Sequence, residues 1–191
     1  MLRLCLLALV LHLAAAAAGA APVRYALDPA RSHVGFTYAT GDSTHDGEMP
    51  VDSAELRLDL DNLPASRIRV VLDARRARTG FFVATRILKG PRMLDVANHP
   101  EVRFRSTRIT GRPGAAQVRG RLTVRGVTRP VTLRARIYRQ RGTAPGQRDH
   151  LLLQLEGTIS RAAFGATAFP RLVDDRVGLN VRAVIDRAAT P

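Results

Sequence analysis

The feature that most constrains this chain is an alternation of apolar and polar side chains that recurs along almost its whole length. Residues 51–60 alternate Ala54, Leu56 and Leu58 with charged residues, and residues 176–186 alternate valine and leucine with arginine and asparagine. Successive side chains on a β-strand point to opposite faces, so a period of two predicts strands with one buried face. A slip of one residue would expose every apolar side chain, so the pairing register is firmly specified.

We expect eight or nine strands with turn residues between them. The alternating segments are residues 23–27, 34–38, 54–60, 68–72, 102–107, 118–125, 131–138, 151–159 and 176–186. Many short strands at this spacing are typical of an all-β antiparallel barrel or sandwich. Residues 80–94 interrupt the pattern, because Phe82, Ile87 and Leu88 fit a short helix at about 80–90 that Gly90 and Pro91 end. We expect this helix near the barrel mouth, where its apolar residues either plug the core or line the entrance to a cavity.

The first twenty residues have the form of a secretory signal peptide. Arg3 supplies a positive start, residues 4–18 are apolar, and residues 18–20 read Ala-Gly-Ala, a small-x-small cleavage site. The apolar stretch is short for a membrane span of about 20 residues, and a retained anchor is the alternative. Cleavage after Ala20 predicts one domain over 21–191, located in the periplasm and lacking Cys5, the chain's single cysteine.

The charge of the chain comes almost entirely from arginine. Thirty basic residues against 16 acidic ones give a net charge of +14, and Lys89 is the one lysine. Arginine occupies the polar face of most predicted strands, which indicates a solvated exterior whose side-chain stems cover apolar surface. Such a surface favours transient contact with an anionic membrane. Nucleic acid is not an expected partner, because aromatics are only 5% of the chain and the signal peptide exports it.

Residues suited to catalysis or metal binding are sparse. The histidines of the exported part lack metal-ligand spacing and are interpreted as turn or surface residues: His33, His45, His99 and His150. The pairs Asp42/Asp46 and Asp174/Asp175 lie in turn-like stretches, where aspartate commonly bonds its own backbone. No nucleophile elbow or phosphate-binding loop is present. We therefore expect no catalytic residue, no metal site and no enzymatic activity.

Four motifs resemble those of the YceI-like family, a group of secreted, lipocalin-like proteins that bind polyisoprenoids. They read YALDPARSHVGF at 25–36, NHPEVRF at 98–104, GRLTVRGVTRPV at 120–131 and SRAAFG at 160–165. The resemblance implies an eight-stranded antiparallel lipocalin-like β-barrel and a non-enzymatic lipid-binding function. Two departures from the family pattern fall where ligand-facing loops are expected. Residues 47–49 read Gly-Glu-Met, and the polar helix start of the family is replaced by Phe-Phe-Val-Ala at 81–84.

Medium-sized aliphatic walls with few aromatic rings favour an elongated apolar tunnel inside such a barrel. We expect it to hold a long-chain isoprenoid, either a quinone or a polyprenyl lipid, with no other cofactor. The candidates for contact with the ligand, in the cavity and at its entrance, are Phe36, Tyr38, Phe81, Phe82, Leu88, Met93, Leu94, Phe104, Phe164 and Phe169. For each of them the alternative is plain packing in the core. The alternative function is a packed-barrel stress or interaction module that binds a protein or an anionic membrane through its arginine-rich exterior. Oligomeric state does not follow from the sequence.

Overall fold

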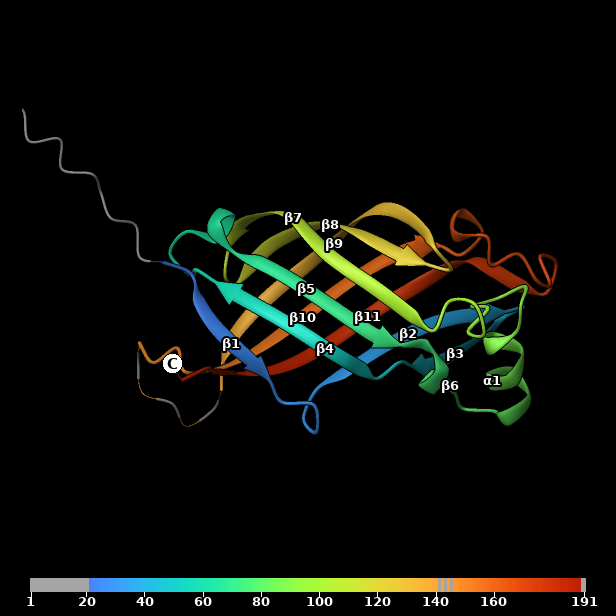
Figure 1. The fold of residues 1–191 in the computed structure, drawn as a ribbon, viewed down its shortest axis with the longest axis horizontal. Helices are drawn as coiled ribbons and strands as arrows, with labels where there is room; N and C mark the ends of the chain where they lie inside the picture. The colour runs from blue at the N-terminus through green and yellow to red at the C-terminus, as the bar shows by residue number, and fades with distance from the viewer. Residues whose placement is uncertain (1–20, 141, 143, 145, 190–191) are drawn as a thin grey trace, which may run out of the picture.

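The computed structural model describes residues 21–140, 142, 144 and 146–189, and most of them lie in strands of one continuous sheet (Figure 1). The signal-peptide prediction for residues 1–20 lies outside the described residues. The strands are β1 (Val23–Leu27), β2 (His33–Thr40), β3 (Ser43–Glu48), β4 (Val51–Leu58), β5 (Arg67–Asp73), β6 (Arg78–Thr79), β7 (Glu101–Arg112), β8 (Ala115–Val124), β9 (Val127–Arg139), β10 (His150–Ser160) and β11 (Val173–Arg187). The helices are α1 (Phe82–Lys89) and three 3-10 turns, η1 (Leu63–Ala65), η2 (Ala74–Arg76) and η3 (Ala162–Phe164).

The sheet closes on itself as an antiparallel barrel. Its wall runs in the order β1, β4, β5, β7, β8, β9, β10, β11, and β1 then pairs back with β11. The closing register places Tyr25 opposite Arg187 and Leu27 opposite Ile185. The predicted eight-stranded antiparallel barrel is confirmed. Full closure satisfies the backbone groups that an open sheet would leave unpaired at its edges.

The short strands β2, β3 and β6 lengthen this wall toward one end. Residues 177–182 of β11 pair with β2, and residues 185–187 of the same strand pair with β1. β3 leads through Met49 and Pro50 into β4, and β6 pairs with β3. β2 therefore extends the wall position of β1, β3 that of β4 and β6 that of β5, and the barrel keeps eight positions.

β3 forms where the sequence predicted no strand, and the prediction that Asp46 lies in a turn-like stretch is wrong. Gly41 has a φ of +55° and reverses the chain, so that Ser43 pairs with Thr40 and Asp46 with Thr37. This polar strand is held by backbone pairing with β2 and, at Gly47 and Glu48, with β6. A search for alternating apolar residues cannot detect such a strand. Asp174 and Asp175 likewise belong to β11, at an irregularity of its register between Val173 and Val177.

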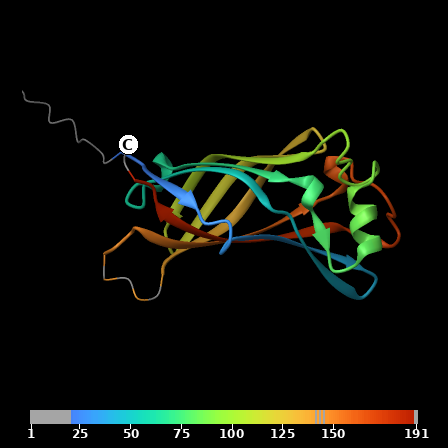
Figure 2. The same cartoon turned by 60° about the horizontal axis from the view of Figure 1, so that its bottom comes forward.

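The predicted short helix is confirmed as α1, and it lies across the end of the barrel that β2 and β3 extend (Figures 1 and 2). The hydroxyl of Thr85 accepts a hydrogen bond of 2.9 Å from the backbone N–H of Thr79, which ties the first turn to β6. Gly90 ends the helix. Within the described ranges, none of the helices has the length and hydrophobicity that a bilayer span requires.

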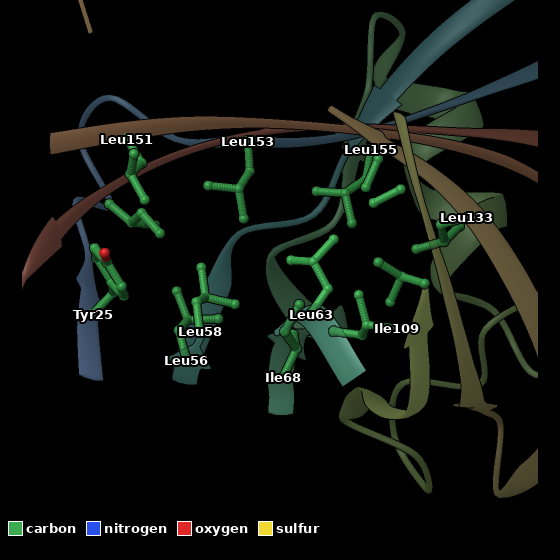
Figure 3. Close-up of a cluster of buried hydrophobic side chains, with 14 residues drawn as sticks. Tyr25, Leu56, Leu58, Leu63, Ile68, Ile109, Leu133, Leu151, Leu153 and Leu155 are labelled. Atoms are coloured by element: carbon green, nitrogen blue, oxygen red, sulfur yellow. The ribbon is translucent and has the colours of Figure 1, made fainter. Parts of the chain in front are cut away.

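The opposite end of the barrel is closed by packed aliphatic side chains (Figure 3). Leu58, Leu63, Leu151 and Ile185 are each at most 3% exposed, and Leu63 reaches this cluster from η1. Tyr25 packs beside them and donates its hydroxyl hydrogen to the Arg148 carbonyl at 2.9 Å. Burial of these side chains makes a solid floor beneath the interior of the barrel.

Candidate ligand-binding site

Above this floor the interior of the barrel is hollow. A cavity of about 590 Å³ runs through it, within the range of about 300–1,000 Å³ typical of small-molecule sites. Its wall is almost entirely aliphatic and aromatic carbon, contributed by strands all round the barrel. The floor residues Leu58, Leu63 and Leu151 do not line it, so the cavity is blind at that end.

The cavity opens at the end that carries α1. Phe81, Val83 and Leu172 all line it, yet their side chains are 60–67% exposed. β7 is 12 residues long, which at about 3.3 Å per residue is about 40 Å of strand. A tilt of about 35–45° brings the height of the wall to about 30 Å. The site is therefore a deep tunnel that opens at this end.

Two glycines keep aromatic rings flat against the wall. Gly47 lies opposite Phe36 across the β2–β3 pair, and a Cβ at Gly47 would stand 2.2 Å from Phe36 Cζ. A Cβ at Gly120 would likewise stand 2.4 Å from Phe104 Cε2. Because no side chain occupies these two positions, each ring lies over its glycine. The lumen stays open despite the bulk of both phenyl groups.

One side of the mouth carries a small polar and aromatic cluster. The rings of Tyr38 and His45 have centroids 5.2 Å apart, and His45 meets Phe81 edge-on at 6.0 Å. His45 Nε2 and Thr40 Oγ1 share a hydrogen bond of 2.6 Å. All four residues line the cavity. This cluster offers hydrogen-bonding groups at the entrance of an otherwise apolar tunnel.

Arg161 is a buried cation at the same end, and it donates hydrogen bonds to backbone carbonyl groups and, at 4.0 Å, to the Met93 sulfur. Its guanidinium donates to Ala166 at 2.6 Å, Ala168 at 2.8 Å, Val173 at 2.8 Å and Asp174 at 2.9 Å. These four bonds fasten the segment between η3 and β11 to the barrel. Arg161 lines the cavity, and its hydrogen bonds hold the segment between η3 and β11 in place.

Nine of the ten sequence-predicted cavity residues line the tunnel: Phe36, Tyr38, Phe81, Leu88, Met93, Leu94, Phe104, Phe164 and Phe169. Phe82 is the exception, since it does not line the cavity and its side chain is 81% exposed. Phe82 is the first residue of α1, and at about 100° per residue it lies on the helix face opposite the four helical residues that line the cavity, Val83, Ala84, Ile87 and Leu88. Ligand contact by the nine residues stays a prediction.

Sequence reasoning missed His45, which it placed in a turn or on the surface. The signal that would have found it is the two-residue turn at Gly41 and Asp42, because counting outward from that turn pairs His45 with Tyr38. Cross-strand partners point to the same face of a sheet. Arg161 was missed as well, since arginine alternates with apolar residues throughout the chain and nothing local distinguishes it.

The carboxyl groups with displaced pKa values stand away from the cavity. Arg31 lowers the pKa of Asp28, Arg148 lowers that of Asp61, and Arg75 lowers that of Asp73. The Ser160 hydroxyl and the Ala162 amide lower the pKa of Asp175 at the start of β11. In the part of the chain that the structure describes, no three histidine, cysteine or acidic side chains come together as a metal site.

Comparison with known proteins gives matches over most of the chain. The model of the YceI-like domain matches residues 25–185. A UPF0312 protein of Pectobacterium atrosepticum is 28% identical over 136 residues, which cover 71% of this chain and 67% of that protein.

Two solved structures share the fold. BcnA of Burkholderia cenocepacia superposes with a TM-score of 0.75 at 20% identity, covering 86% of this chain and all of BcnA. A polyisoprenoid binding domain from Saccharophagus degradans gives a TM-score of 0.63 at 12% identity, covering 87% of this chain and 99% of that domain. At these identities the likeness establishes a common barrel architecture.

Proposed function

This chain belongs to the YceI-like family, and from that membership we propose that it binds a long-chain isoprenoid lipid inside the barrel without catalysing a reaction on it. The observation that carries the proposal is the blind, carbon-walled tunnel of about 590 Å³. The same hollow interior supports a ligand-binding barrel over the alternative of an interaction module with a packed barrel. The Saccharophagus degradans domain of the same fold, a polyisoprenoid binding domain, supports the choice of ligand class.

The energetics favour a long tail. Each buried methylene contributes about 0.8 kcal/mol, whereas association costs on the order of 4–15 kcal/mol. A tail of about ten carbons therefore roughly breaks even, and useful affinity requires a longer one. A wall about 30 Å tall has the length to enclose such a chain.

The mouth favours an uncharged head group that accepts hydrogen bonds. When His45 Nε2 accepts the Thr40 hydroxyl hydrogen, Nδ1 carries its own hydrogen and serves as a donor. The Tyr38 hydroxyl, which has no hydrogen-bond partner among the described residues, is a second donor. Arg161 already donates to four carbonyl groups and is a poor partner for a phosphate. The hydrogen-bonding groups that line the mouth therefore match the carbonyl oxygens of a quinone.

The ligand proposal is tested on protein purified without detergent. Native mass spectrometry should show one bound lipid per chain, and the emptied protein should take up a long-tailed quinone saturably. The same quinone with a single isoprene unit should bind far more weakly. A protein that is consistently empty and takes up no prenyl lipid would overturn the proposal.

The head-group preference is tested with Tyr38→Phe, which removes one donor and keeps the ring. This variant should lose affinity for the quinone and keep its affinity for a prenyl hydrocarbon that has no head group, because the tail contacts are unchanged. Equal affinity of Tyr38→Phe and wild type for the quinone would exclude a role for this hydroxyl.

We place this activity in the periplasm, on the form of residues 1–20. Expression of the full chain followed by fractionation and N-terminal sequencing tests the location. The expected product begins at Ala21 in the periplasmic fraction, and an uncleaved cytoplasmic chain would contradict it.

A further inference from the structure

In the part of the chain that the structure describes, most of the exposed large apolar side chains lie at the mouth of the tunnel. Of the seven such residues in the described part of the chain, six lie on two segments beside the mouth, and only Tyr138 lies elsewhere. The six are Phe81, Phe82, Val83, Ile87, Phe169 and Leu172, and we call them the apolar rim. Exposed apolar side chains gathered in one place mark an interaction surface.

The two segments of the rim are joined to each other. The backbone N–H groups of Thr167 and Ala168 donate to the Arg92 carbonyl at 3.1 and 3.2 Å, which links the loop before β11 to the segment after α1. Both segments lie at the same end of the barrel in two views (Figures 1 and 2). Five of the six rim residues also line the tunnel, so the exposed surface continues into the lumen without a polar break at these positions.

Phe169 shows that this exposure is built into the backbone. It has a φ of +52°, a conformation in which a bulky side chain is strained by about 1–2 kcal/mol. Its carbonyl accepts hydrogen bonds from Leu172 at 3.0 Å and Val173 at 2.9 Å, which hold the turn. Glycine would make this turn without strain, yet the position carries a phenyl ring that is 48% exposed. Stability of the fold does not account for that ring.

The charges beside the rim are all positive on these two segments. Arg86, Lys89, Arg92 and Arg171 lie within them, and neither residues 80–94 nor residues 161–172 contain an acidic side chain. The β2–β3 hairpin, which reaches the mouth through His45, carries Asp42 and Asp46. The acidic residues nearest in sequence, Asp95 and Asp174, lie just outside the two ranges, so the basic and apolar side chains form an uninterrupted stretch on each segment.

We propose that the apolar rim docks this protein on an anionic lipid surface, with the tunnel mouth facing the bilayer. Apolar side chains bordered by basic ones are the pattern by which proteins lie in a membrane interface. The inference rests on the proposed function in one respect: a lipid tail has to leave a bilayer to reach the tunnel. With the rim inserted, the tail passes from acyl chains to lumen along apolar side chains and does not cross water.

Phe82 provides a clean test, because it is the rim residue that does not line the tunnel. We expect the wild-type protein to float with vesicles of phosphatidylglycerol and phosphatidylcholine in equal amounts, and to float less with phosphatidylcholine alone. Phe82→Asp should weaken partitioning onto the vesicles by about tenfold or more, since a phenyl ring that inserts into the membrane interface is replaced by a charge. Tyr138→Asp, at an exposed site near the floor, should float as wild type does.

Quinone uptake from detergent-free solution is measured on the same three proteins and separates the two proposals. Uptake should be equal in wild type and Phe82→Asp, so lost flotation with normal uptake supports docking. If Phe82→Asp loses flotation and none of the three proteins takes up a prenyl lipid, docking is supported and the ligand proposal fails. Docking is overturned by wild type that does not float, or by Phe82→Asp that floats equally well.

Sedimentation velocity tests whether the apolar rim instead binds a second copy of this chain. Wild type should sediment as the same species as Phe82→Asp at all concentrations. A wild-type dimer that Phe82→Asp dissociates would assign the rim to self-association and overturn the membrane proposal.

Discussion

A hollow lumen predicts that enlarging an inward side chain leaves the fold intact. Ala54 lies on β4 opposite Val70 of β5, and it lines the tunnel. In a packed core, an added phenyl ring costs about 1–3 kcal/mol in strain. In the tunnel the ring enters free space, where its burial contributes about 1.5–3 kcal/mol, less the entropy of its rotamers. We expect Ala54→Phe to keep or raise the free energy of unfolding, by about 1 kcal/mol at most.

Ligand affinity should move the other way, because the ring takes the place of part of the tail. Each displaced methylene costs about 0.8 kcal/mol, so displacing about four of them costs about 3 kcal/mol. That energy corresponds to about a 200-fold increase in Kd for a long-tailed quinone. Urea unfolding of the emptied protein gives the stability, and quinone titration of the same sample gives the affinity.

The matched control is Ala135→Phe, which makes the same change in the floor. Ala135 is 4% exposed, packs in the closed end of the barrel and does not line the tunnel. This variant should lose about 1–3 kcal/mol or more. If Ala54→Phe were destabilised as strongly as Ala135→Phe, or bound the quinone as tightly as wild type, the reasoning from a hollow lumen would be refuted.

Three further predictions concern the wall and the loop at the mouth. Gly47→Ala should push the Phe36 ring into the lumen, because its Cβ would stand 2.2 Å from that ring, and quinone capacity should fall in titration; adding Phe36→Leu should restore it. Arg161→Met leaves four carbonyl groups without their donor, so the free energy of unfolding should fall by about 3 kcal/mol or more in urea, with early proteolysis between η3 and β11. Asp175 has a pKa below its unfolded value of 3.8, so its bonds stabilise the fold above that pH and the stabilisation is lost as the pH falls further. Urea titrations should therefore find Asp175→Asn less stable than wild type at neutral pH, with the gap closing below about pH 4; a gap independent of pH would contradict the assignment.

The alternation of side chains was sufficient to predict most strands of the wall, whereas the choice of a closed barrel over a sandwich came from the family resemblance. The first strand was expected at residues 23–27 and lies at Val23–Leu27, and the segment before Gly90 forms α1 as expected. Such local patterns succeed because side-chain direction in a strand is set by the backbone itself. β3 was missed for the corresponding reason, since its polar side chains report nothing about the two strands that pair with it.

The candidate site divides in the same way. Apolar residues expected at the cavity do line it, because a closed barrel turns one face of every strand inward. Phe82 differs because the rotation of a two-turn helix is fixed by what it packs against. The contact between Tyr38 and His45 depends on a hairpin, and Arg161 depends on a loop that folds back over it.

The sequence alone determined that the long strands of the wall each have one apolar face and that their pairing has a single stable register, because a slip of one residue would place their aliphatic side chains in water. Only the tertiary structure decided that the enclosed space is empty above the floor. That outcome depends on the volume of all inward side chains against the radius of eight strands, and on phenyl rings lying over glycines of other strands. Neither the free volume of the barrel nor these contacts between strands can be predicted from a local stretch of the sequence.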